Sequence, residues 1–94
     1  MKVVLRKRAI NALLKSANFV ESINTPDSGD RWLEKIKKVI YELAASKAKF
    51  AICKHASLAK FSYRCYVYND WVIAFRIKEN EFEVCRVILG SRLW

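Results

Sequence analysis

Residues 71–89 read WVIAFRIKENEFEVCRVIL, and this stretch decides the fold. Two runs rich in β-branched and aromatic residues, Trp71–Lys78 and Glu81–Leu89, are separated by only two residues. Such runs favour β-strands, and a two-residue separation is typical of a tight hairpin. A second two-residue break, Asn69 and Asp70, precedes them and follows a third run of the same kind, residues 61–68. The chain from residue 61 onward is therefore predicted to form an antiparallel meander of three strands.

Upstream of the meander the apolar residues change their spacing. Lys2–Leu5 is rich in valine and predicts a short strand. From about Arg8, and again after the Pro- and Gly-containing segment 24–30, apolar residues recur at helical spacing, which predicts two helices separated by that segment. The first stripe is Ile10, Leu13, Leu14, Ala17 and Val20; the second is Trp32, Leu33, Ile36, Val39, Ile40 and Leu43. For residues 50–53 the pattern leaves a short extended segment and a buried loop equally open.

The order of these elements predicts a single α+β domain over residues 1–94. An N-terminal strand and a helical hairpin precede the antiparallel three-stranded meander (β-α-α-β-β-β), with the helices on one face of the sheet. If both turns contain two residues, alternation assigns each strand residue to a face. One face then carries Tyr66, Tyr68, Trp71, Ile73, Phe75, Ile77, Phe82, Val84 and Ile88, and the other Tyr63, Cys65, Val67, Val72, Ala74, Cys85, Val87 and Leu89. Two helices cover only one face, so either this register is wrong or an apolar face is left for a partner, which is the reading we favour.

Composition excludes several classes of protein. The 94 residues are 53% apolar with a formal net charge of +9, which argues against a disordered chain because disorder requires low hydrophobicity. Two Gly and one Pro exclude collagen-like and low-complexity sequences. No apolar run approaches the roughly 18 residues that span a bilayer, and the apolar stretch at the start is too short for a signal-peptide core. The sequence therefore predicts a cytoplasmic protein with no membrane partner.

The number and spacing of the cysteines are also typical of a cytoplasmic protein. Cys53, Cys65 and Cys85 are odd in number, widely spaced and without a C-x-x-C pair, so we expect three reduced thiols rather than a disulfide scaffold. The single histidine, His55, lies two residues after Cys53 with no second ligand pair nearby, and no metal or other cofactor is predicted. A nucleophile–base pair of Cys53 and His55 would lack a third group to orient it. We expect His55 to be a solvated or capping residue in a loop.

Positive charge is concentrated in two parts of the chain. Residues 1–20 and 43–69 contain no acidic residue. Their basic residues are Lys2, Arg6, Lys7, Arg8, Lys15, Lys47, Lys49, Lys54, Lys60 and Arg64. Such an asymmetry predicts a polyanion or an acidic protein segment as partner. Motifs of nucleic-acid-binding domains, Gly-rich phosphate loops and hydrolase signatures are absent from the sequence.

Residues 71–77 and 82–92, with the order of elements and the small basic composition, resemble the RelE/ParE superfamily of bacterial toxins. In that family a final strand of type V-x-R-V-x-H-G-x-R closes a sheet packed on a helical hairpin, and residues 86–92 read RVILGSR here. The resemblance covers essentially the whole chain. It implies the toxin of a type II toxin–antitoxin module, neutralised by a cognate antitoxin that lays an extended, often helical segment over the sheet and helices. The implied target is ribosome-bound mRNA, cut by a RelE-like endoribonuclease, or DNA gyrase, inhibited by a ParE-like toxin.

The resemblance also implies site residues. Arg92 matches the arginine of the closing motif, which in nuclease members contacts the scissile phosphate, and a guanidinium suits that charge. Leu89 stands where many members have histidine, and the C-terminal tyrosine of some nucleases has no counterpart. Arg64 or Arg76 could replace the arginine that opens the penultimate strand in RelE-like enzymes. The candidate catalytic residues are thus Arg92, Arg64 and Arg76, and the candidate substrate-binding residues are Lys54 and Lys60.

Two hypotheses of different class follow. The first is a toxin, and whether it is an enzyme stays open: the missing histidine and tyrosine favour a gyrase inhibitor, whereas the basic surface favours an mRNA nuclease. The second is a non-toxic or decayed basic interaction domain without catalytic activity, which Leu89 in place of histidine favours. Growth arrest on expression, relieved by the product of a neighbouring gene, distinguishes the first from the second.

Overall fold

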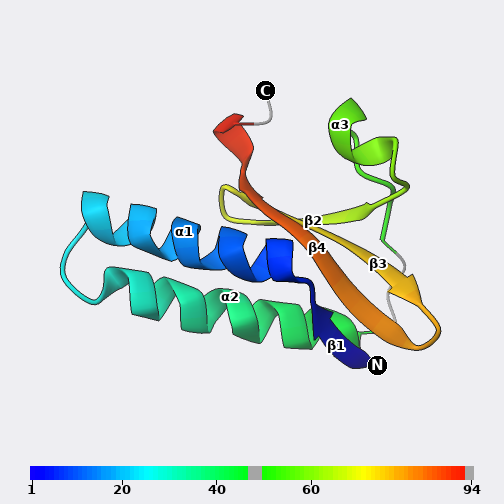
Figure 1. The fold of residues 1–94 in the computed structure, drawn as a ribbon, viewed down its shortest axis with the longest axis horizontal. Helices are drawn as coiled ribbons and strands as arrows, with labels where there is room; N and C mark the ends of the chain where they lie inside the picture. The colour runs from blue at the N-terminus through cyan, green and yellow to red at the C-terminus, as the bar shows by residue number, and fades with distance from the viewer. Residues whose placement is uncertain (47–49, 93–94) are drawn as a thin grey trace.

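The computed structural model, which describes residues 1–46 and 50–92, has the expected order of elements (Figure 1). The elements are β1 (Lys2–Leu5), α1 (Lys7–Ile23), α2 (Ser28–Ala45), α3 (Ala56–Ala59), β2 (Arg64–Tyr68), β3 (Trp71–Lys78), β4 (Glu81–Leu89) and the 3₁₀ turn η1 (Gly90–Arg92). The four strands form one mixed sheet in the order β1-β4-β3-β2. β2, β3 and β4 are the predicted antiparallel meander, and β1 pairs in parallel with β4. The α+β prediction is confirmed.

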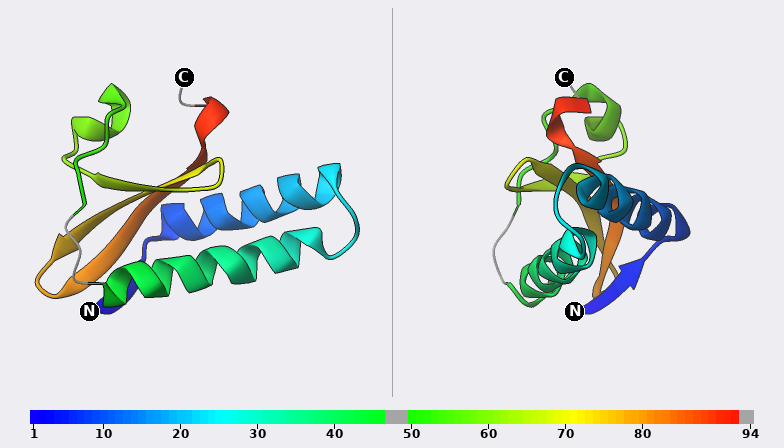
Figure 2. Two further views of the ribbon diagram at one scale, coloured as in Figure 1. Left: turned by 180° about the vertical axis from the view of Figure 1, so that it is seen from behind. Right: turned by 90° about the vertical axis from the view of Figure 1, so that its left-hand side faces the viewer.

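The two long helices form an antiparallel hairpin on one face of the sheet, as the views in Figures 1 and 2 show. α2 begins at Ser28, inside the segment expected to separate the helices. A Cβ atom on Gly29 would lie 2.5 Å from the backbone oxygen of Ala17, so glycine permits a close approach of α2 to α1 that alanine would prevent. The N–H of Gly29 also donates a hydrogen bond to Glu21 Oε1 at 3.0 Å. The connection is therefore tight because the start of α2 packs directly on the end of α1.

The main core lies between this hairpin and the sheet. Its largest fully buried side chains are Phe75 and Phe82, which stack at a centroid distance of 4.4 Å. The stripe predicted for α2 faces this core, but the stripe predicted for α1 is partly wrong. Ile10 and Leu14 are 41% and 52% exposed, and the buried face of α1 is formed by Ala9, Leu13 and Ala17. Ala9 and Ala17 allow the close helix packing around the buried Leu13, and Ile10 and Leu14 are left facing outward.

A β-bulge in β4 corrects the predicted register. Ala74 pairs with Arg86 whereas Phe75 pairs with Val84, so Cys85 is an extra residue in β4. An inserted residue moves every later side chain to the other face. The prediction is therefore wrong beyond Val84: Val87 and Leu89 join the core under the helices, and Ile88 joins the opposite face.

The opposite face, here called the second face, is partly covered by the chain itself. Residue 52 forms an isolated antiparallel bridge with Arg64, which identifies residues 50–53 as a short extended segment. The following turn and α3 then lie over the sheet, where Cys53 and Leu58 pack on Val72 and Ala74. The expectation that this whole face is left for a partner is wrong, because a loop and one turn of helix were not expected to bury it.

Candidate functional site

Two of the candidate catalytic arginines, Arg64 and Arg76, do not converge. Arg64 pairs with Phe75 and so lies on the helix side of the sheet, where its Nη1 donates a hydrogen bond to the backbone oxygen of Phe50. Arg76 is the next residue along β3, and its pairing with Glu83 places it on the second face. Phe75 and Arg76 are neighbours in β3, and neighbouring strand residues point to opposite faces of a sheet. Because Arg64 shares the face of Phe75, Arg64 and Arg76 cannot bind one phosphate group together.

Arg76 is instead part of a charge cluster around a buried carboxylate. The Glu83 side chain is 3% exposed, and its two oxygens lie 2.7 Å from Arg6 Nη2 and 2.7 Å from Arg76 Nε. The hydrogen bond from Arg6 lowers the pKa of the Glu83 carboxyl against the opposing effect of burial, and Arg76 lowers it further. Burial, followed by the charge of Glu83, raises the pKa of the neighbouring Cys85 thiol. This cluster joins β3 and β4 to the connection between β1 and α1, which is a structural role for Arg76.

The candidate substrate-binding lysines flank α3. Lys54 and Lys60 are exposed, and Lys60 Nζ lies 5.2 Å from the centre of the Phe61 ring. His55 is the N-cap of α3, as expected of a capping loop histidine: its Nδ1 accepts a hydrogen bond from the Ser57 N–H at 3.2 Å and lies 2.6 Å from Ser57 Oγ. The two lysines therefore belong to the loop that covers the second face.

The prediction of three reduced thiols is wrong for two of the cysteines. Cys53 and Cys65 form a disulfide with Cα atoms 4.9 Å apart, and Cys85 is the free, buried cysteine. The extended segment at residues 51–53 runs antiparallel to residues 63–65, with the Cys53 N–H donating to the Tyr63 oxygen at 2.8 Å. Spacing alone did not reveal this pair because the sequence left the conformation of residues 50–53 open. Cys53 consequently cannot act as a nucleophile in this state.

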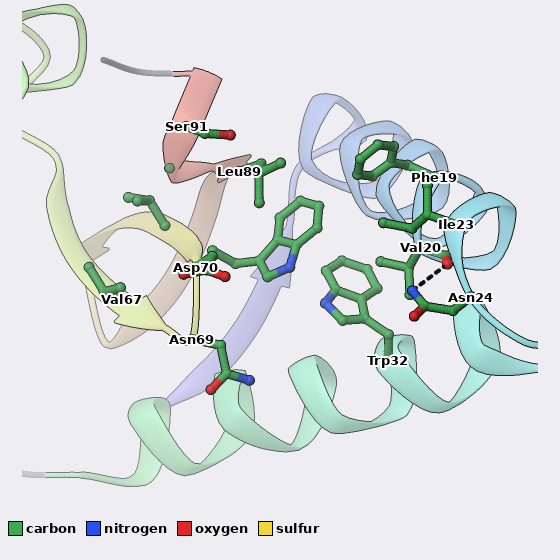
Figure 3. Close-up of a pocket in the computed structure, with 13 residues that line it drawn as sticks. Phe19, Val20, Ile23, Asn24, Trp32, Val67, Asn69, Asp70, Leu89 and Ser91 are labelled. Atoms are coloured by element: carbon green, nitrogen blue, oxygen red, sulfur yellow. Dashed lines mark hydrogen bonds between the residues drawn. The ribbon is translucent and has the colours of Figure 1, made fainter.

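The closing motif ends beside an aromatic cleft of about 900 Å³ (Figure 3). Leu89 lines it together with Gly90 and Ser91; the side chain of Arg92 lies outside the described part of the chain. The cleft separates the end of the helical hairpin from the β2–β3 turn, and Trp32 and Trp71 meet in it at a centroid distance of 4.7 Å. The full lining is Phe19, Val20, Ile23, Asn24, Trp32, Val67, Asn69, Asp70, Trp71, Val72, Leu89, Gly90 and Ser91.

One polar atom beside this cleft is unusual. The indole nitrogen Nε1 of Trp32 is buried and has no hydrogen-bond partner among the described residues. Buried donors are almost always paired, but this one is covered by the protein, so a molecule in the cleft does not reach it in this arrangement. The described lining contains one carboxylate, Asp70, and no basic side chain. Sequence reasoning missed this cleft, because the two tryptophans are distant in the chain and each fits the pattern of an ordinary core residue.

Further features of the described residues concern metals and membranes. They include no group of His, Cys, Asp and Glu that could hold a metal ion. None of their helices is both long and apolar enough to cross a membrane. Neither finding assigns a function.

A comparison with protein families decides which family the chain represents. The family described as the ParE toxin of the type II toxin–antitoxin system parDE matches residues 3–94. The chain belongs to this ParE toxin family. No match was found among curated proteins. It is thus a type II toxin, as the resemblance to the RelE/ParE superfamily implied, and its family implies an antitoxin partner.

Proposed function

We propose that this ParE toxin acts by binding DNA gyrase in the cytoplasm and not by cutting mRNA. The observation that carries the proposal is the aromatic cleft, where Trp32 and Trp71 lie together and the described lining has a single carboxylate and no basic side chain. Tryptophan is enriched in protein–protein hot spots, where an aromatic side chain fills a desolvated site. A carboxylate in the lining would repel a scissile phosphate, whereas a protein segment can place an apolar side chain against the aromatic lining.

The placement of the basic residues supports binding over cleavage. RNA cleavage without a metal requires proton transfer by positioned groups or concentrated positive charge at the phosphate. Arg64 and Arg76 lie on opposite faces of the sheet, and Arg76 forms an ion pair with Glu83. The remaining argument for a nuclease is the match of Arg92 to the closing motif, and the experiment below includes that outcome.

The antitoxin would be held on a different surface. Ile10 and Leu14 are exposed on α1, and Lys7, Arg8 and Lys15 of the same helix line a shallow depression beside them. A helical segment with an apolar stripe and acidic flanks complements such a surface, because burial of the stripe and charge attraction act together. We infer that the cognate antitoxin binds across α1 and that it need not enter the aromatic cleft.

The first experiment is inducible expression in a bacterial host, with DNA synthesis and translation labelled separately. A gyrase inhibitor stops DNA synthesis first and leaves ribosome-bound mRNA intact. Early loss of translation with cleaved mRNA, abolished by Arg92→Ala in a folded protein, would establish the nuclease instead. Unimpaired growth with folded, accumulating protein would favour the non-toxic interaction domain.

Two matched variants on α1 separate the target surface from the antitoxin surface. Ile23 lines the cleft and is 64% exposed, whereas Leu14 is 52% exposed and outside it. Exchange of an exposed apolar residue for glutamine leaves the core intact, so both variants should fold. We expect Ile23→Gln to weaken gyrase inhibition about tenfold with antitoxin affinity unchanged, and Leu14→Gln to do the reverse. Supercoiling assays with purified gyrase and titration with the antitoxin measure the two effects; equal effects of both variants on inhibition would contradict a target site in the cleft.

A further inference from the structure

A second groove, of about 370 Å³, lies over the second face of the sheet. Both sulfur-bearing residues of the disulfide line it, together with Lys54, His55 and the apolar side chains of Ile52, Leu58, Val67 and Val72. We propose that the Cys53–Cys65 disulfide is a reversible redox site that controls the opening of residues 54–63, between the first cysteine and β2, over the second face. This inference goes beyond the proposed function, since it requires neither gyrase nor an antitoxin.

The disulfide stands at the base of the segment that it would control. It closes a loop with a sequence separation of 12, and α3 lies inside this loop. The base of the loop is also held by two backbone hydrogen bonds, Cys53 N–H to Tyr63 O at 2.8 Å and Cys65 N–H to Ala51 O at 3.3 Å, and Cys65 itself pairs with Ala74 in the sheet. Between the cysteines, Leu58 and Tyr63 pack on the second face. A covalent tie across the base of a loop limits the conformations open to it, so its loss affects this segment before the rest of the fold.

The two sulfurs are not equally open to attack. Cys53 is 4% exposed and Cys65 is half-buried, and both border the groove. An incoming thiolate is therefore expected to attack Sγ of Cys65. Lys54, next to Cys53 and also in the groove lining, favours the departing thiolate because a nearby cation stabilises the charged form of sulfur. The buried Cys85 thiol has a raised pKa and does not take part.

The reaction is a two-electron thiol–disulfide exchange with a dithiol reductant. Its first thiolate forms a bond to Cys65 Sγ as the Cys53–Cys65 bond breaks, and Cys53 leaves as a thiolate that takes up a proton. The second thiol of the reductant then displaces Cys65 and becomes part of the reductant's own disulfide. Cys53 and Cys65 both end as thiols, and an oxidised dithiol reverses the process. Intracellular disulfides of mesophiles are usually transient or redox-sensing, which suits a cytoplasmic toxin.

Reduction releases the covering of the second face. Val72 and Ala74 are buried beneath Cys53 and Leu58, so opening of the loop exposes apolar sheet surface beside the already exposed Val67. Lys54 and Lys60 move with the loop, which changes the distribution of positive charge on this face. The core under the helices contains neither cysteine and is expected to remain closed.

The test compares the full-length protein after treatment with oxidised glutathione and with dithiothreitol. Alkylation after denaturation should count one thiol in the first sample and three in the second. Hydrogen exchange should show amides 54–63 opening about 100-fold more readily in the reduced sample, which is the effect expected from loss of a disulfide that closes a loop of this size, with β4 amides unchanged. Three thiols in both samples, or equal exchange in the two states, would overturn the proposal.

Trapping of the mixed disulfide in the wild-type protein tests the assigned order of attack. Cys65 is the more exposed of the two bonded sulfurs in the closed loop. Brief treatment with reduced glutathione, followed by acid quenching and peptide mapping, should find glutathione on Cys65 at least tenfold more often than on Cys53. Cys85→Ser is the matched control, and it should keep the wild-type difference in exchange between oxidised and reduced samples. Faster reaction at Cys53, or loss of that difference in Cys85→Ser, would contradict the assignment.

Discussion

The two faces of the sheet are covered in different ways. On one face, two helices of 17 and 18 residues bury a continuous core that includes Phe75 and Phe82. On the second face, a loop with a four-residue helix covers only Val72, Ala74 and their neighbours. Burial of apolar area is the main stabilising contribution to folding. The comparison therefore indicates that one face maintains the fold, while the cover of the other can change without unfolding the protein.

The largest expected effect is on the helix-covered face. Phe82→Ala removes a fully buried ring that stacks on Phe75 and should lower the free energy of unfolding by about 3–5 kcal/mol. Its control is Ile77→Ala, because Ile77 pairs with Phe82 across the same hairpin and is 46% exposed; its cost should stay near or below about 1 kcal/mol. Urea denaturation measures both. Similar costs for the two variants would mean that this face does not dominate stability.

A smaller and more local effect is expected on the second face. Leu58→Ala removes the buried side chain through which α3 packs on the sheet, at a cost of about 2–3 kcal/mol to the closed state of the loop. Because the loop can open by itself, hydrogen exchange of residues 54–63 should accelerate more than the global unfolding free energy falls. Ala59→Gly, in the same short helix, is the control for helix propensity alone. Uniform acceleration over the whole chain would show that both faces unfold as one unit.

Much of the helix-covered face was predictable from the sequence, because the signals that determine it lie in short stretches of the chain. The two-residue breaks at Asn69–Asp70 and Glu79–Asn80 fix the pairing of β2, β3 and β4, and positive φ angles at Asn69, Glu79 and Asn80 agree with tight turns. The pairing of Arg76 with Glu83 also follows from the second turn, so half of the charge cluster could have been inferred. The stripe on α2 was correct because a helix against a sheet requires one apolar face.

The second face and the cleft were not predictable for physical reasons. The bulge at Cys85 adds one residue to a strand, and no residue preference in the sequence distinguishes it from a regular strand. Ile10 and Leu14 look like core residues until tertiary packing selects the small residues of α1 instead. The contact of Trp32 with Trp71 depends on the angle between α2 and the sheet, which periodicity does not determine.

The smallest expected effect concerns the polar end of the second face, where Glu83 lies between Arg6 and Arg76. Glu83→Gln keeps the shape of the side chain but loses the charge on two short hydrogen bonds, so it should cost about 1–3 kcal/mol at neutral pH. The pKa of Glu83 is lowered in the folded protein, first by the hydrogen bond from Arg6. The carboxylate therefore contributes its full stability above the unfolded-state pKa of about 4.3 and loses it as the pH falls through the folded value.

The difference between wild type and Glu83→Gln in the free energy of unfolding should thus be constant between pH 7 and about pH 5 and shrink at lower pH. Urea denaturation at several pH values between 3 and 7 measures it. Lys78→Gln, at an exposed position two residues further along β3 from Arg76, is the control and should show no such trend. A difference that stays constant down to pH 3 would mean that Glu83 is not held as a carboxylate by the two arginines. In that event the charge of Glu83 would add nothing to the free energy of unfolding, and the polar end of the second face would not be stabilised by its ion pairs.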